Sequence, residues 1–137
     1  MYDDGKVDLD RLVTMFGGRI EYRDSVEALH VRDAGDFTIF VPQFTSSARD
    51  RFTIAHELGH YFLHYRFAGH SDERTFGRGQ RNRAETEANV FASALLMPKD
   101  EFRRQWRASA QDEWKVANYF DVSPAAAKVR AQVLDLS

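Results

Sequence analysis

The chain has 137 residues, no cysteine and a formal net charge of −2, so it has the size of one domain and excludes disulfide scaffolds, cysteine nucleophiles and thiolate metal sites. This near-neutral charge supplies no overall field that would attract nucleic acid. Its apolar stretches are shorter than the roughly 20 residues that span a membrane, and its acidic first ten residues lack the apolar core of a secretory signal. We therefore expect a cytoplasmic protein, one domain over residues 1–137, that binds neither membranes nor nucleic acid directly.

Residues 1–45 predict a helix followed by a small sheet. Apolar residues recur at helical spacing from Val7 to Phe16, and Gly17 ends that helix. Three short strands are expected at 19–22, 28–31 and 37–41, with residues 33–36 as the turn of an antiparallel hairpin.

The rest of the chain has helical patterning. Residues 46–98 predict two long helices, at about 47–65 and 83–96, and residues 99–137 predict three shorter ones at 99–107, 112–120 and 124–134. Between the two long helices lies an arginine-rich connection, 66–82, which suits a functional lid and a solvated loop equally well. The fold class is therefore α+β, with a small antiparallel three-stranded sheet packed on a mostly helical domain.

The first long helix contains the pattern His-Glu-x-x-His. Its histidines, His56 and His60, are four residues apart, so their side chains lie about 5–6 Å apart at Cβ and both imidazoles can bind one zinc ion. Glu57 borders the open side of such an ion, where a carboxylate takes a proton from metal-bound water instead of ligating the metal. The pattern predicts a zinc site.

A catalytic zinc site needs a third protein ligand, and spacing alone leaves its identity open. His64, Glu85 and Glu87 are the main candidates, with His70 and Asp72 as weaker ones. His64 lies a further turn along the same helix and drifts away from the metal. Glu85 and Glu87 are two residues apart on the second helix, so only one of them can face the ion.

Two blocks of sequence resemble the ImmA/IrrE family of intracellular zinc metalloendopeptidases. They read Arg51-Phe-Thr-Ile-Ala-His56-Glu-Leu-Gly-His60-x-x-x-His64 and Glu87-Ala-Asn89-Val-Phe91-Ala-Ser-Ala-Leu95-Leu-Met97-Pro98. Residues 116–134 are similar to the family's closing helix-turn-helix-like segment, with Asp121 where a glycine is usual. The resemblance implies a zincin-like metalloprotease fold.

Carried over position by position, the resemblance implies a specific site. His56 and His60 bind one zinc ion per chain, Glu87 is the third ligand, and Glu57 is the general base that deprotonates the water attacking the scissile carbonyl. Glu85 is then expected to face solvent. Mn²⁺ is a possible substitute for zinc.

Four further side chains near the pattern have no settled role. His64 has either a role in orienting other groups of the site or a structural one. Tyr61, Tyr65, His64 and His70 are each candidates for stabilising the developing oxyanion.

The resemblance also implies a regulatory protease that cleaves a helix-turn-helix repressor of the Cro/CI type and so derepresses stress or mobile-element genes. The expected strand at Thr38–Val41 is a candidate edge for pairing with an extended substrate, and an interior position is equally compatible with the pattern. The alternative function is a non-catalytic DNA-binding or protein-interaction module with a structural metal site. Against DNA binding, the basic residues of 112–136 are offset by acidic ones.

Overall fold

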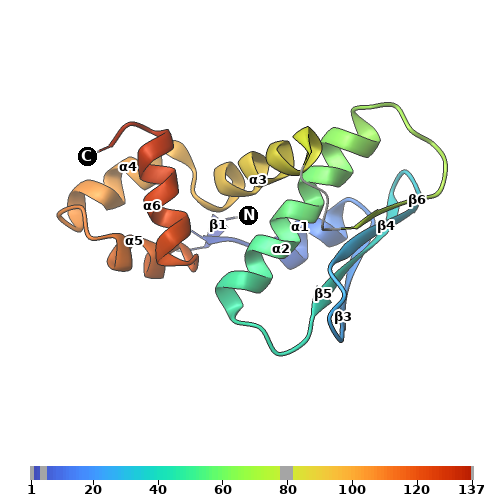
Figure 1. Ribbon diagram of the computed structural model, residues 1–137, viewed down its shortest axis with the longest axis horizontal. Helices are drawn as coiled ribbons and strands as arrows, with labels where there is room; N and C mark the ends of the chain where they lie inside the picture. The colour runs from blue at the N-terminus through green and yellow to red at the C-terminus, as the bar shows by residue number, and fades with distance from the viewer. Residues whose placement is uncertain (1, 4–5, 78–81, 137) are drawn as a thin grey trace.

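The computed structural model describes residues 2–3, 6–77 and 82–136 and has an α+β architecture. Figure 1 shows the sheet at one end, helices α2 and α3 in the middle, and helices α4, α5 and α6 gathered at the other end. The elements in chain order are β1 (Tyr2–Asp3), β2 (Lys6–Val7), α1 (Leu9–Met15), β3 (Gly18–Arg23), β4 (Ala28–Asp33), β5 (Asp36–Pro42), α2 (Ser47–Gly59), η1 (His60–Arg66), β6 (Arg74–Gly77), α3 (Arg83–Leu96), α4 (Lys99–Ala108), α5 (Glu113–Phe120) and α6 (Pro124–Val133).

The main sheet has four strands in the order β3-β5-β4-β6 and is mixed, which corrects the expected three-stranded antiparallel sheet. The β4–β5 hairpin is antiparallel as predicted, with Leu29 opposite Ile39. β3 instead runs parallel to β5, with Ile20 opposite Ile39. The direction of β3 could not be read from its sequence, because alternation of side chains is the same in parallel and antiparallel strands.

The fourth strand, β6, lies within the connection that was expected to be a loop. It pairs antiparallel with β4 and places Phe76 opposite Leu29. Because β6 joins β4 and β3 joins β5, the strand containing Thr38–Val41 is interior, so of the two positions left open by the sequence the edge is excluded. β6 and β3 are the edges of this sheet.

Helices α2 and α6 begin at their predicted positions because their N-terminal caps are local. Ser46 accepts a hydrogen bond from the backbone N–H of Arg49 at the start of α2, and Ser123 does the same for Ala126 at the start of α6. Asp121, between α5 and α6, has a left-handed backbone with φ of 53°. The helix-turn-helix interpretation of this segment stays a prediction.

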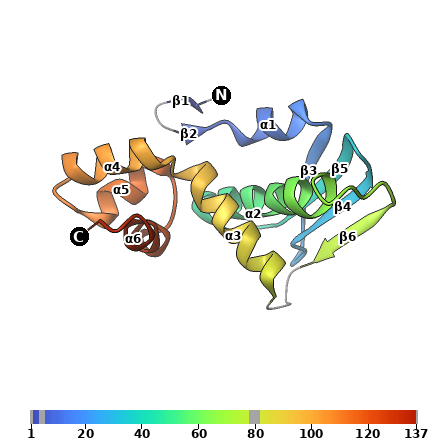
Figure 2. The ribbon, with the colours of Figure 1, turned by 90° about the horizontal axis from the view of Figure 1, so that it is seen from above.

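Helix α2 is the centre of the fold. It packs on the sheet through β5 and crosses α3 on another side, and Figure 2 shows α1 and α3 on opposite sides of α2. Leu58 of α2 and Leu29, Phe37 and Ile39 of the sheet are completely buried in the core. None of the described helices combines the length and apolar character needed to cross a membrane.

Helices α2 and α3 approach each other closely at Gly59. A Cβ added there would lie 3.1 Å from Cδ1 of Phe91 and 3.2 Å from both Cα and the carbonyl oxygen of Ala88. The second and third of these atoms belong to the backbone of α3, so a larger side chain can fit only if the two helices separate. Gly59 therefore permits the approach that positions α3 beside the histidines.

We expect Gly59→Leu to lower the free energy of unfolding by about 1–3 kcal/mol, because overpacking at this crossing forces backbone shifts. Denaturant unfolding followed by circular dichroism measures the change. The control is Gly77→Leu, since an added Cβ at Gly77 meets no described atom within 4 Å. Equal stability of the two variants would contradict the role given to Gly59.

Candidate metal centre

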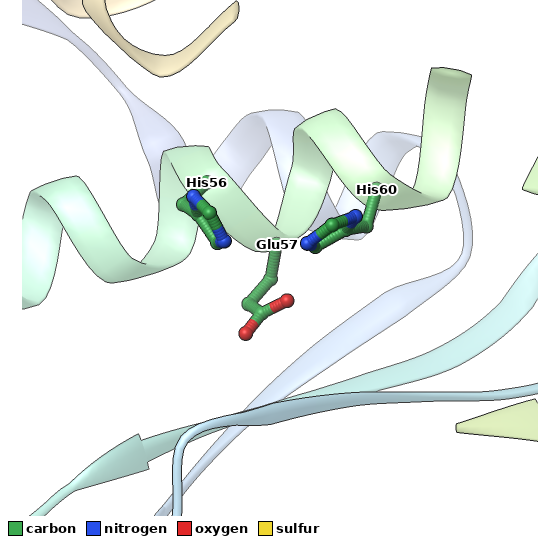
Figure 3. Close-up of side chains that lie close together, drawn as sticks. All are labelled: His56, Glu57 and His60. Carbon is green, nitrogen blue, oxygen red and sulfur yellow. The ribbon is translucent and has the colours of Figure 1, made fainter. Parts of the chain in front are cut away.

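Helix α2 presents His56, Glu57 and His60 as a compact buried cluster. Their exposed fractions are 0%, 0% and 3%, and the candidate ligand atoms of the three side chains all lie within 4.8 Å of one another. Figure 3 shows the Glu57 side chain extending away from the helix between the two imidazoles. The helical spacing of the sequence pattern thus brings these three residues together as predicted.

Helix α3 brings Glu85 to both histidines. Its Oε1 lies 2.7 Å from Nε2 of His60 and its Oε2 lies 3.2 Å from Nε2 of His56, and 17% of its side chain is exposed. The expectation that Glu85 faces solvent is therefore corrected. Because one carboxylate contacts both Nε2 atoms, the three side chains converge on one point.

Glu87 lies elsewhere, because two helical positions turn it away from Glu85. Its Oε1 is 2.9 Å from Nε2 of His64, its Oε2 is 3.6 Å from Nε of Arg83, and 46% of its side chain is exposed. The hydrogen bond from His64 holds the pKa of the Glu87 carboxyl below its ordinary value. The structure thus brings Glu85, and not Glu87, together with His56 and His60.

Asn89 orients His56 from α3. Its side-chain oxygen lies 2.8 Å from Nδ1 of His56, so it accepts the Nδ1 proton and leaves the Nε2 lone pair of a neutral imidazole to face Glu85. This contact was not predicted from the sequence. The available signal was its spacing, since Asn89 is four residues after Glu85 and shares a helix face with it.

The ring of His60 is held by contacts with His64 and Phe76. Its Nδ1 lies 2.8 Å from Nδ1 of His64, and its ring stacks on Phe76 of β6 with centroids 5.5 Å apart. Burial lowers the pKa of His60, and the hydrogen bond with Glu85 opposes part of this shift. The lowered pKa favours the neutral imidazole, which is the form that binds metals.

The contact between His60 and His64 lies in a segment where the helix geometry changes. From His60 to Arg66 the helix widens into the π-helical segment η1, and the backbone N–H of Phe67 donates to the carbonyl of Phe62, five residues earlier, at 2.8 Å. Such segments are rare and occur frequently at functional sites. The widening changes where His64 lies relative to His60 and was not predicted.

The remaining candidates for oxyanion stabilisation make contacts elsewhere. The Tyr61 hydroxyl accepts a hydrogen bond from the backbone N–H of Gly35 at 2.8 Å, and the Tyr65 hydroxyl donates to the carbonyl oxygen of Asp72 at 2.7 Å. His70 has its Nδ1 3.9 Å from Asp72 and its ring beside Tyr65. These contacts tie η1 to the β4–β5 turn and to the segment that follows η1, and a role of the three side chains in stabilising the oxyanion stays a prediction.

The donor atoms that converge here suit a divalent metal ion. Two imidazole nitrogens and one carboxylate are a common ligand set of catalytic zinc sites, which keep a further position for water or substrate. The adjacent Glu57 carboxylate is a fourth group within reach, as the 4.8 Å cluster shows. Sequence and structure together therefore describe a candidate metal centre with a buried carboxylate, Glu57, beside it.

Comparison with known proteins agrees with this site. Residues 22–132 match the family model of peptidase M78, described as an IrrE N-terminal-like domain. The match includes all the residues of the site and most of the chain. No curated protein matches the chain.

We expect zinc to stabilise the chelator-treated protein, because an ion that binds only the folded state adds about 2.7 kcal/mol at 100 times its dissociation constant. Thermal unfolding with and without added Zn²⁺ measures the effect. Mg²⁺ is the control, because it prefers oxygen ligands and should raise the melting temperature much less. An unchanged melting temperature with both Zn²⁺ and Mn²⁺ would contradict a metal centre.

Proposed function

Because the chain belongs to the M78 peptidase family of IrrE N-terminal-like domains, we propose that it is a zinc-dependent endopeptidase whose metal ligands are His56, His60 and Glu85. Membership of a metallopeptidase family implies a protein substrate. The observation that carries the ligand assignment is the contact of one Glu85 carboxylate with both Nε2 atoms, at 2.7 and 3.2 Å. A zinc ion held by these residues supplies a Lewis acid that polarises the scissile carbonyl and acidifies water.

Glu57 is proposed to move the proton. Its carboxylate lies beside the ligand atoms, within the 4.8 Å cluster, and its complete burial shields it from competing solvent. A carboxylate in this position accepts a proton from the attacking water and returns it to the leaving amine, as general base and then general acid. Glu57 cannot do this as an amide, although an amide has nearly the same shape.

We expect Glu57→Gln to bind about one metal ion per chain and to lose at least about 10²-fold in peptide hydrolysis, the usual contribution of a general acid–base group. Metal content by elemental analysis and cleavage of an unstructured peptide library measure the two properties. Full hydrolytic activity in Glu57→Gln would refute this mechanism, and loss of metal would make Glu57 a ligand instead.

The identity of the third ligand is tested by replacing each of the two glutamates of α3 by alanine in turn. Glu85 contacts His56 and His60, whereas Glu87 contacts His64 instead. We therefore expect Glu85→Ala to lose its metal on dialysis, whereas Glu87→Ala still binds about one ion when zinc is in excess. Glu113→Ala, at the start of α5, is a matched control. If Glu85→Ala retained its metal and Glu87→Ala lost it completely, Glu87 would be the third ligand, as the sequence resemblance implied.

For the substrate, we propose an extended segment of a helix-turn-helix repressor of the Cro/CI type. Support for the repressor comes from the family resemblance. Support for an extended segment comes from the position of β6, an edge strand whose Phe76 stacks on His60, because open strand edges bind extended peptides through backbone hydrogen bonds. A role in derepressing stress or mobile-element genes follows from that substrate.

Direct DNA binding by α5 and α6 is the alternative function, and the position of Arg130 weighs against it. Only 8% of Arg130 is exposed, and its Nε donates to the carbonyl oxygen of Met97 at 3.1 Å. A guanidinium committed in this way is not available to a phosphate, so the already weak positive charge of the segment is reduced further.

A further inference from the structure

We propose that Glu87 and His64 act together as positioning residues, which hold the imidazole of His60 in the tautomer and orientation needed for metal binding. This inference rests on the metal centre proposed above and gives Glu87 a role other than ligation. The contacts form a continuous row: Glu87 Oε1 to His64 Nε2 at 2.9 Å, His64 Nδ1 to His60 Nδ1 at 2.8 Å, and His60 Nε2 to Glu85 Oε1 at 2.7 Å.

With a metal ion bound at Nε2 of His60, the direction of the hydrogen bonds follows from counting protons. A carboxylate only accepts, so His64 donates to Glu87 from its Nε2. A neutral His64 then carries no proton on Nδ1, and the proton between the two rings belongs to Nδ1 of His60. A neutral His60 with its proton on Nδ1 has a lone pair on Nε2 that is available to the metal ion. This is the tautomer that a metal ligand bound through Nε2 requires. Without the ion, the 2.7 Å contact of Nε2 with Glu85 requires a proton between the two atoms.

The opposite direction leaves two acceptors in contact. If His64 donated from Nδ1 to His60, its Nε2 would carry only a lone pair and would face the Glu87 carboxylate at 2.9 Å. Glu87 therefore determines the direction of the whole row, although its own carboxylate does not reach the donor atoms of the metal centre.

The two histidines of the centre are supported in different ways. His56 donates from Nδ1 directly to Asn89 on α3, at 2.8 Å. His60 reaches its acceptor on α3, Glu87, only through His64. Acceptors behind a metal-binding histidine raise its basicity and fix its ring, and their loss typically weakens metal binding by 10–100-fold.

A second contact of Glu87 supplies the control. Arg83 lies four residues earlier on α3, 3.6 Å from Oε2 of Glu87, and 92% of its side chain is exposed. Exposed ion pairs of this kind contribute little. Arg83→Ala therefore tests whether a change of charge near Glu87 alters zinc affinity while the contact of Glu87 with His64 is kept.

The test is the dissociation constant of zinc, measured by competition with a chromophoric chelator. We expect His64→Ala and Glu87→Ala each to raise it about 10–100-fold, and Arg83→Ala to leave it unchanged. Because Glu87 acts through His64, the double variant should match His64→Ala within about twofold. Glu87→Gln keeps an oxygen that accepts from His64 and should recover most of the affinity.

The absorption spectra of the Co²⁺-substituted proteins add a second measurement, which a change in stability alone would not alter. The ligand-field absorption should shift in His64→Ala and Glu87→Ala, because His60 reorients, and should match the wild type in Arg83→Ala. Circular dichroism of the metal-free variants identifies any that fail to fold. If His64→Ala fails to fold, the zinc dissociation constants of Glu87→Gln and Glu87→Ala are the decisive comparison.

Several results would overturn the inference. Wild-type affinity in both single variants, additive losses in the double variant, or no recovery in Glu87→Gln would each show that the row does not position His60. Complete loss of metal in Glu87→Ala would make Glu87 a ligand. A wild-type protein that binds no metal would refute the proposed function itself, which distinguishes that failure from failure of the positioning role alone.

Discussion

The close contact between α2 and α3 at Gly59 is the constraint on which the rest of the site depends. Gly59 lies within the His-Glu-x-x-His pattern, and Ala88 faces it from α3. The small side chains allow the helix backbones to approach, and the neighbours of Ala88 along the same side of α3 then reach the histidines: Glu85 contacts both Nε2 atoms, and Asn89 contacts Nδ1 of His56. A metal centre divided between two helices is thus assembled by one helix crossing.

Burial explains why the polar partners are needed. His56 and Glu57 have no exposed surface, and a polar group removed from water destabilises the fold unless it is hydrogen-bonded. Asn89 meets that requirement for Nδ1 of His56 and Glu85 for Nε2 of His60, and both contacts orient the rings at the same time. Glu87 is much more exposed, at 46% of its side chain, than Glu85 and His64, at 17% and 15%. The inner side of the centre is therefore enclosed by protein, and its outer side at Glu87 is open to solvent.

The sequence predicted most helices and the three longer strands of the sheet because the signals for them are local. Ser46, Ser123 and the apolar periodicities act within a few residues. The pairing of β3 with β5 and the existence of β6 were not predictable in the same way. Alternation does not distinguish parallel from antiparallel neighbours, and Arg74–Gly77 has one half-buried side chain, Phe76, whose partners lie on β4 and η1.

The candidate site separates what the sequence determined by itself from what only the tertiary structure decided. The sequence determined that His56, Glu57 and His60 share one region of a helix, because helical periodicity alone brings residues four apart together. It did not determine which glutamate of α3 faces them, since Glu85 and Glu87 lie on different sides and only the packing of α3 on α2 selects one. Nor did it determine the row of contacts from Glu87 through His64 to His60, which needs α3 to pack beside the π-helical segment η1.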